Sequence, residues 1–205
     1  GLIPTADPYG LQKSTTPEVL AVSGDDAIVD WVLVEIRSSD DSSEVLASLP
    51  ALLQKDGDVV STDGISPPIV GLDSGQYYIA VRHRNHLGVM TASPVNLSDT
   101  VDFTLPETSV FGIDSRKQTD SSMFLWEGDV NGDGDIKYTG ENNDRDLILQ
   151  WIGGVVPTNS DGGYLDTDVN MDGVVKYTGE DNDRDLILLN IGGVVPTNTR
   201  SGTLP

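Results

Sequence analysis

The sequence has no cysteine and few aromatic or basic residues, and each shortage narrows the range of functions. Without cysteine, a disulfide framework and thiol catalysis are excluded. The 12 basic residues face 33 acidic ones, giving a formal net charge of −21, so binding of nucleic acid is excluded as the main function because like charges repel. No run approaches the ~18 apolar residues of a transmembrane helix, which predicts a chain without a membrane span. The natural counter-ion of such an acidic chain is a metal cation.

An internal repeat occupies the second half of the chain. Residues 167–198 repeat residues 128–159 at an offset of 39, and 25 of the 32 aligned positions are identical. The segment that links them, 160–166, consists mainly of turn-forming residues. Because this link is short, we expect the two units to pack directly on each other.

The residues before the repeats have the pattern of an all-β domain. Segment 27–37 is rich in β-branched and aromatic residues, and segment 76–84 alternates residue by residue. Asp56-Gly57 is a strong hairpin-turn signal. Short strands separated by such turns are typical of a β-sandwich. The expected strands are 27–37, 45–54, 76–84, 89–97 and 100–105.

Each repeat opens with a pattern of oxygen-bearing residues that is typical of a calcium loop. Acidic or amide side chains at positions 1, 3 and 5, followed by glycine at position 6, begin an EF-hand loop, and Ca²⁺ prefers six to eight oxygen ligands. The next residue contributes only its carbonyl, so valine is acceptable there. The predicted ligands are Asp129, Asn131, Asp133 and the carbonyl of Asp135 in the first loop, and Asp168, Asn170, Asp172 and the carbonyl of Val174 in the second.

The acid that closes each loop is displaced from its usual place. Position 12 is Gly140 or Gly179, which have no side-chain ligand, so an insertion must move the closing acid onward. We expect this acid to be Asp146 and Asp185, directly before the Leu-Ile-Leu stretch of a short helix. Asp144 and Asp183 are rival or additional ligands. The same Asn-Asp-Arg-Asp cluster is expected to cap the helix, which Ile-Gly-Gly ends.

The loop Asp129–Gly134, followed by an acid and a Leu-Ile-Leu helix, resembles the dockerin repeat. Dockerins carry two calcium loops, each followed by a helix, and the resemblance implies one Ca²⁺ per repeat. The insertion after Lys137 and Lys176 departs from ordinary dockerins. The Ser/Thr and Lys/Arg positions through which dockerins bind cohesin are not recognisable here, so cohesin binding is not implied.

A second resemblance covers most of the chain. Residues 71–84 are similar to a turn and strand of prealbumin-like sandwich modules. Segments 1–10, 29–37, 52–60 and 77–95, together with the doubled repeat, resemble the C-terminal region of secreted Bacteroidota surface proteins of adhesin or haemagglutinin-like type. This resemblance implies an extracellular, cell-surface location. The predicted fold class is therefore mainly β: a prealbumin/Ig-like β-sandwich followed by a small α-helical, dockerin-like tandem calcium-loop domain.

These patterns divide the chain into five parts. The N-terminal residues include several prolines and few core-forming side chains, so we expect them to be extended and hypothesise that they add a strand to a neighbouring copy. The parts are an extended N-terminal segment (1–20), a β-sandwich domain (21–107), a linker (108–122), a calcium-binding repeat domain (123–199) and a C-terminal tail (200–205).

No catalytic constellation is recognisable. His83 and His86 flank a turn without a third ligand or a nucleophile, and no Gly-x-Ser-x-Gly or phosphate loop occurs. We therefore expect a non-enzymatic, calcium-stabilised structural module, part of a surface adhesin or a subunit of a self-assembling extracellular fibre. Its expected partners are copies of itself or other cell-surface proteins. The alternative is a dockerin-like or glycan-binding module that docks a separate partner, with Trp126 and Trp151 as candidate contacts.

Overall fold

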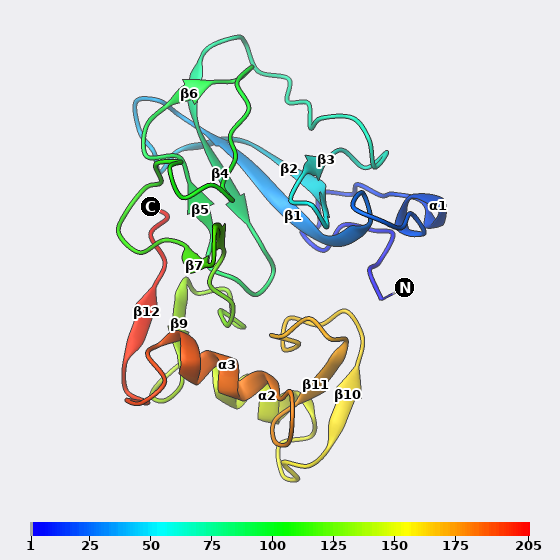
Figure 1. Ribbon diagram of the computed structural model, residues 1–205, viewed down its shortest axis with the longest axis vertical. Coiled ribbons are helices and arrows are strands. Elements are labelled where there is room, and N and C mark those ends of the chain that lie inside the picture. The colour runs from blue at the N-terminus through cyan, green and yellow to red at the C-terminus, as the bar shows by residue number, and fades with distance from the viewer. Residues whose placement is uncertain (1) are drawn as a thin grey trace.

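The computed structural model, which describes residues 2–205, places a β-sheet above the two repeats (Figure 1). Its antiparallel sheet has the order β3-β2-β1-β4-β5, with β6 pairing to β4. The helices are α1 (Pro17–Leu20), α2 (Asp144–Trp151) and α3 (Asp183–Asn190). The strands are β1 (Ile28–Arg37), β2 (Val45–Gln54), β3 (Val59–Val60), β4 (Gln76–Arg82), β5 (Val89–Met90), β6 (Val95–Asn96), β7 (Lys117–Thr119), β8 (Ser122–Phe124), β9 (Asp135–Lys137), β10 (Ser160–Gly162), β11 (Val174–Lys176) and β12 (Thr199–Ser201).

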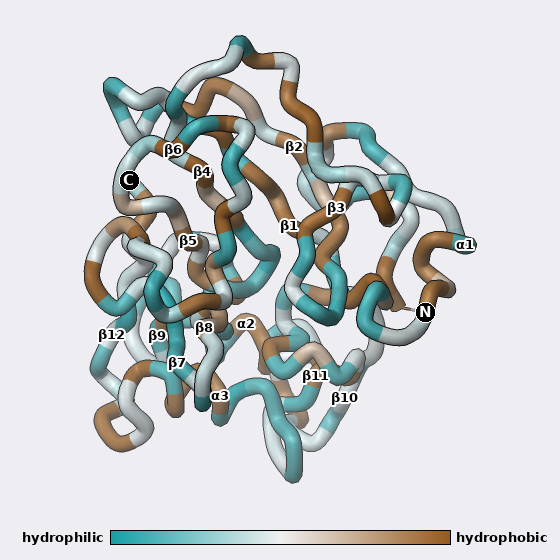
Figure 2. The backbone as a smooth tube through the Cα atoms, turned by 45° about the horizontal axis from the view of Figure 1, so that its top comes forward, coloured by the Kyte–Doolittle hydropathy of each residue, from teal (hydrophilic) through white to brown (hydrophobic). Residues whose placement is uncertain are grey.

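Strand β1 lies at the centre of the sheet, paired with β2 on one edge and β4 on the other, and both of its faces are covered. Val32, Val34 and Ile36 are buried on one face, while Trp31 is buried in a different apolar cluster. This strand is largely hydrophobic in Figure 2. The mainly β class and the strands expected at 27–37, 45–54 and 76–84 are thus confirmed. Strands β1 to β6 belong to one curled sheet, and the finer class of β-sandwich stays a prediction.

Two expected strands differ from the structure. Segment 89–97 divides into β5 and β6, because Pro94, which has no N–H to donate, stands between them. Segment 100–105 forms turns instead of a strand. Asp102 Oδ1 accepts hydrogen bonds from the N–H and the hydroxyl of Thr104, and Arg116 donates to three carbonyls of segment 103–108. These side chains satisfy the backbone locally, so no ladder is needed.

The N-terminal segment is folded back on its own sheet, whereas an extended segment was expected. Its main chain forms a small loop in which Thr15 N donates to the carbonyl of Thr5 over 2.8 Å. Trp31 holds this segment in place, because its Nε1 donates to the carbonyl of Pro4 and its own carbonyl accepts from the hydroxyl of Tyr9. The segment therefore completes the apolar cluster around Trp31 within the same chain.

The two repeats are intertwined by short strands. Strand β10, which follows the first repeat, pairs with β11 inside the second, and β12, which follows the second, pairs with β9 inside the first (Figure 1). Two side-chain hydroxyls also bond across the repeats: Thr139 of the first donates to the carbonyl of Pro196 in the second, and Thr178 of the second donates to the carbonyl of Pro157 in the first. Each repeat thus depends on residues that follow the other.

The repeats share one apolar core. Equivalent residues from both copies enter it, including Ile136 with Val175 and Ile148 with Ile187, all four of them fully buried. Leu87, from the turn between β4 and β5, is buried in the same cluster. The sheet and the repeats are therefore packed against each other. Among residues 2–205, no helix has the length and apolar character needed to cross a membrane.

Candidate metal centres

Asp144 is at the centre of the first loop and is fully buried. Its Oδ1 accepts hydrogen bonds from the main-chain N–H groups of Val130 and Asn131, over 2.8 and 3.3 Å, and its Oδ2 accepts from that of Lys137 over 2.8 Å. Asp183 makes the equivalent three bonds in the second loop. One carboxylate thus joins the beginning and the end of each loop.

Asp129 and Asp168 are the first residues of the two loops, and each has one oxygen without a hydrogen bond. Both side chains are more than nine-tenths buried. In each, Oδ2 accepts from the N–H of the loop glycine, Gly134 or Gly173, while Oδ1 is buried and has no partner within residues 2–205. A buried carboxylate oxygen without a donor is unfavourable unless a cation lies beside it.

The other loop residues shape a tight turn around these acids. Asn131 Oδ1 accepts from the N–H of Asp133, whose own Oδ1 accepts from the N–H of Asp135, and Asn170 and Asp172 repeat this pattern in the second loop. Both loop glycines have φ of +86°, a conformation that favours glycine. The predicted ligands at positions 1, 3 and 5 of each loop are thus on one tight turn.

The acids expected to close the loops lie elsewhere. Asp146 lies in the first turn of helix α2 and bonds to the N-cap residue: its N–H donates to Oδ1 of Asn143, and its Oδ2 accepts from Nδ2 of the same residue. Its Oδ1 pairs with Arg145 at the surface, where the Asp146 side chain is 57% exposed. Asp185 has the same contacts in the second repeat. Asp146 and Asp185 thus bond to the helix N-caps and the surface, whereas Asp144 and Asp183, the rival or additional ligands, lie buried at the centres of the loops.

The expected helix caps agree with the structure. Asn143 and Asn182 are the N-cap residues of α2 and α3, and acidic residues fill both first turns. After α2, the N–H groups of Gly153 and Gly154 bond back to the last turn, and Gly153 has a φ of +107°. Hydrogen bonding to Asn143 is the main cause that lowers the pKa of Asp146.

Burial disfavours the ionised form of the central acids. It raises the pKa of Asp144 to about 7, with the nearby Asp129 carboxylate acting in the same direction. It also raises the pKa of Asp129 and that of Asp183 to about 6, and it raises the pKa of Asp168. Each loop thus holds two acids that a divalent cation would stabilise in their ionised form.

These shifts predict that cation binding releases protons near neutral pH. A bound cation requires ionised carboxylates, whereas at pH 6.5 part of the Asp144 population holds a proton. At pH 8.5 Asp144, Asp129 and Asp183 are ionised, so the release from these three acids should vanish. We expect the calcium-binding heat at pH 6.5 to differ between two buffers of different ionisation enthalpy, and to agree between buffers at pH 8.5. Equal heats at pH 6.5 would contradict the shifts.

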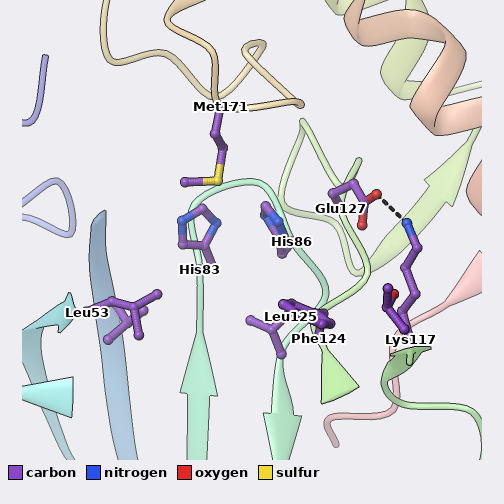
Figure 3. Close-up of a pocket in the computed structure, with 10 residues that line it drawn as sticks. Leu53, His83, His86, Lys117, Phe124, Leu125, Glu127 and Met171 are labelled. Carbon is purple, nitrogen blue, oxygen red and sulfur yellow. Dashed lines mark hydrogen bonds and ion pairs between the residues drawn. The ribbon is translucent and has the colours of Figure 1, made fainter. Parts of the chain in front are cut away.

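Within residues 2–205, no group of three or more His, Cys, Asp or Glu side chains is arranged to hold a metal ion. Each loop brings together three acids (Asp129, Asp133 and Asp144, or Asp168, Asp172 and Asp183), one amide and main-chain groups. His83 and His86 pack edge to face, 4.4 Å between ring centroids, and line a cavity of about 420 Å³ beside Met171 (Figure 3). His83 Nε2 lies 3.0 Å from Asp30, which also pairs with Arg84.

The aromatic residues near the repeats have two different environments. Trp126 is partly buried and stacks under the guanidinium of Arg200, 3.5 Å from the ring centroid. Trp151, at the end of α2, is 50% exposed, and its Nε1 donates to Asp161. Tyr138 lies against Arg145.

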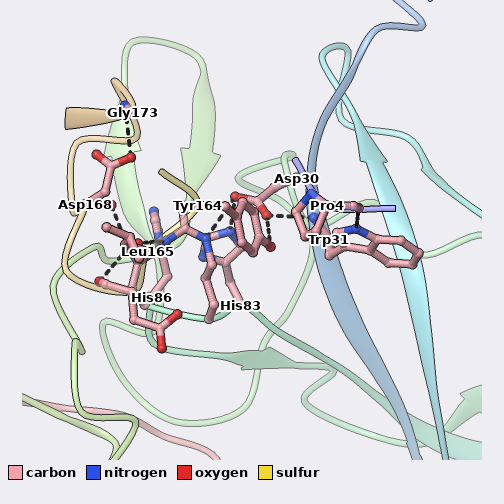
Figure 4. A network of polar contacts seen from close by, with 12 residues as sticks. Pro4, Asp30, Trp31, His83, His86, Tyr164, Leu165, Asp168 and Gly173 are labelled. Atoms are coloured by element: carbon pink, nitrogen blue, oxygen red, sulfur yellow. Dashed lines mark hydrogen bonds and ion pairs between the residues drawn. The ribbon is translucent and has the colours of Figure 1, made fainter. Parts of the chain in front are cut away.

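The turn between β4 and β5 connects the sheet to the loops, and the sequence had given no sign of this role. Arg84 donates to the carbonyl of Leu165, and Tyr164 donates to Asp30 (Figure 4). The same Arg84 lies 4.4 Å above the Tyr164 ring. The repeats are therefore fixed to the sheet by buried polar contacts as well as by Leu87.

Comparisons with known proteins identify no family for this chain. No protein-family model, curated protein sequence or solved structure matches the chain.

Proposed function

We propose that the two repeats are calcium-binding loops whose metal ions stabilise a non-enzymatic, extracellular structural module. The unpartnered buried oxygen of the first loop residue, present in both copies at Asp129 and Asp168, is the observation that carries this proposal. In this proposal the repeats are dockerin-like, and each consists of a loop followed by an eight-residue helix.

The donor chemistry fits a hard divalent cation. Carboxylate and amide oxygens line each loop, with the ammonium of Lys137 or Lys176 at its edge, and Ca²⁺ takes carboxylate, amide and main-chain oxygens with flexible geometry. Asp129 Oδ1 and the carboxylate of Asp133 would hold the ion in the first loop, and Asp168 and Asp172 would do so in the second. Asp144 and Asp183 would close the loops, with the carbonyls of Asp135 and Val174 as further predicted ligands.

The structural role follows from what the ions would hold together. Each loop includes a strand that pairs with the segment after the other repeat, so two ions would stabilise the whole intertwined unit. A surface adhesin or a fibre subunit needs such rigidity, and cell-surface copies or other surface proteins are the proposed partners. The N-terminal segment covers its own sheet, so this proposal does not require it to add a strand to a neighbour.

Thermal unfolding with and without calcium tests the proposal. Each ion at ~100 times its dissociation constant stabilises the fold by ~2.7 kcal/mol. For two ions in a chain of this size, we expect a rise in melting temperature of about 10–20 °C. Calorimetric titration should give two calcium ions per chain.

Magnesium provides the control, because Mg²⁺ demands near-ideal octahedral geometry and dehydrates reluctantly. We expect the same concentration of magnesium to raise the melting temperature much less than calcium does. Equal melting temperatures in calcium and in chelator, together with no binding heat, would contradict the proposal.

A further inference from the structure

Asn85, in the turn after β4, contacts the beginning of both loops. Its Nδ2 donates to the carbonyls of Asp166 and Asp168, over 3.0 and 2.8 Å. Its own carbonyl accepts from the N–H of Gly128 over 2.9 Å. The side chain is fully buried and lies between the sheet and the two repeats. Figure 4 shows Asp168 of the second repeat and Leu165 of the preceding link beside the turn that carries His83 and His86.

The contacts of Asn85 fall on equivalent places in the two repeats. Asp168 is the first acid of the second loop, and Gly128 directly precedes Asp129, the first acid of the first loop. Both acids have the unpartnered Oδ1 described above. A single residue of the sheet therefore fixes the main chain at the first predicted ligand of each loop.

The amide of Asn85 is fully used by these contacts. Both hydrogens on Nδ2 have carbonyl partners, and Oδ1 lies 2.8 Å from Nδ1 of His86. An amide is the side chain that can donate twice and accept once from a single planar group. Asp168 is buried, as is Asn85 itself, so rotation of this amide would leave buried polar groups unpaired, which makes the arrangement rigid.

From this geometry we propose that Asn85 is a positioning residue that couples calcium binding at the two loops. The inference rests on the proposed calcium function. An ion in the first loop orders the main chain at Gly128, which holds the Asn85 carbonyl and thereby orients its amide toward Asp168. The second loop then loses less conformational entropy when it binds its own ion, so its calcium affinity is higher. By thermodynamic linkage, an ion in the second loop raises the affinity of the first loop by the same factor.

A double-mutant cycle tests this coupling. Asp129→Ala disables the first loop, and the calcium affinity of the second loop is then measured by calorimetric titration. With Asn85 present, we expect Asp129→Ala to weaken the second loop at least about fivefold, the lower end of typical coupling. Asn85→Leu removes the donors at similar volume and equal charge. In this background, we expect Asp129→Ala to weaken calcium binding at the second loop less than about twofold. An equal factor in both backgrounds would overturn the proposal.

Gln54 offers a matched control. It is also buried, and its Nε2 donates to the carbonyls of Asp26 and Gly64, away from the loops. Gln54→Met should therefore leave the coupling at its wild-type value. A loss of coupling equal to that of Asn85→Leu would show a general loosening of the sheet and would overturn the specific role of Asn85.

A milder variant keeps the test decisive if Asn85→Leu fails to fold, as judged by the near-ultraviolet circular dichroism of its tryptophans. Asn85→Ser retains one donor with a shorter reach, so we expect a coupling factor between those of wild type and no coupling. A wild-type factor in a folded Asn85→Ser variant would overturn the proposal. Absence of calcium binding by the wild-type chain would instead overturn the proposed function, and the inference with it.

Discussion

In calcium, Asp144→Ala should abolish binding at the first loop and strongly destabilise the fold. The substitution leaves three main-chain N–H groups without their acceptor, and a buried unpaired donor costs about 1–3 kcal/mol. The expected loss of unfolding free energy is therefore on the order of 3 kcal/mol or more. Calorimetric titration should find one calcium ion per chain instead of two. Urea unfolding in calcium should measure the loss of stability.

Asp146→Ala is the matched control, two residues away on the same helix. It keeps the main-chain N–H that bonds to the N-cap Asn143 but removes the acceptor of Asn143 Nδ2 and a surface pair, which together are worth about 1 kcal/mol. We expect this variant to retain two calcium ions with nearly unchanged affinity. If Asp146→Ala lost an ion while Asp144→Ala kept both, the assignment of the closing acid would be reversed. Asp183 and Asp185 allow the same comparison in the second loop.

Removal of residues 199–205 should disable the first loop and spare the second. The truncation removes β12, the partner strand of β9, and the bond from Gly202 N to the carbonyl of Gly134. It also removes Arg200 from the face of Trp126. Strand hydrogen bonds are worth about 1 kcal/mol each and a cation–π contact about 0.5–2 kcal/mol, so a loss of several kcal/mol is expected. Titration should again give one calcium ion per chain.

Arg200→Ala distinguishes the contribution of the β12 main chain to stability from that of the Arg200 side chain. It keeps the main chain of β12 but removes the stack on Trp126 and the bond to the carbonyl of Asn190. We expect a smaller loss of stability and two calcium ions per chain. A truncated chain that still bound two ions would show that pairing with β12 is not needed for the first loop.

Local patterns predicted much of the fold. The β-branched residues of β1 and the alternation of β4 gave their positions within a few residues, and Leu-Ile-Leu followed by glycines marked both repeat helices. The strand predicted at 100–105 was wrong because the turns found there depend on Arg116, a residue farther along the chain. The small strands β9 and β12 were not predicted either, since three-residue strands that pair over a long separation leave no periodic pattern.

The acid at the centre of each loop is not the one that the sequence favoured. Asp144 and Asp146 are two residues apart, so on the helix they point about 200° apart, and only one can face the loop. The N-cap decides between them. Because Asn143 is the N-cap, Asp146 stands at the position that bonds back to it, and the Asn-x-x-Asp spacing is the signal that indicates this. Asn85 had no such signal, because its burial depends on repeats that follow it by more than 40 residues.

The exchange of strands between the repeats sets the order in which the loops can mature. Gly162 meets Val174 across 12 residues, whereas Asp135 meets Ser201 across 66, and closure over a longer separation has a larger entropic cost. As the chain leaves a ribosome, the second loop finds its partner strand already synthesised. The first loop must wait for residues 199–201. The loop that is translated first is thus the one that is completed last.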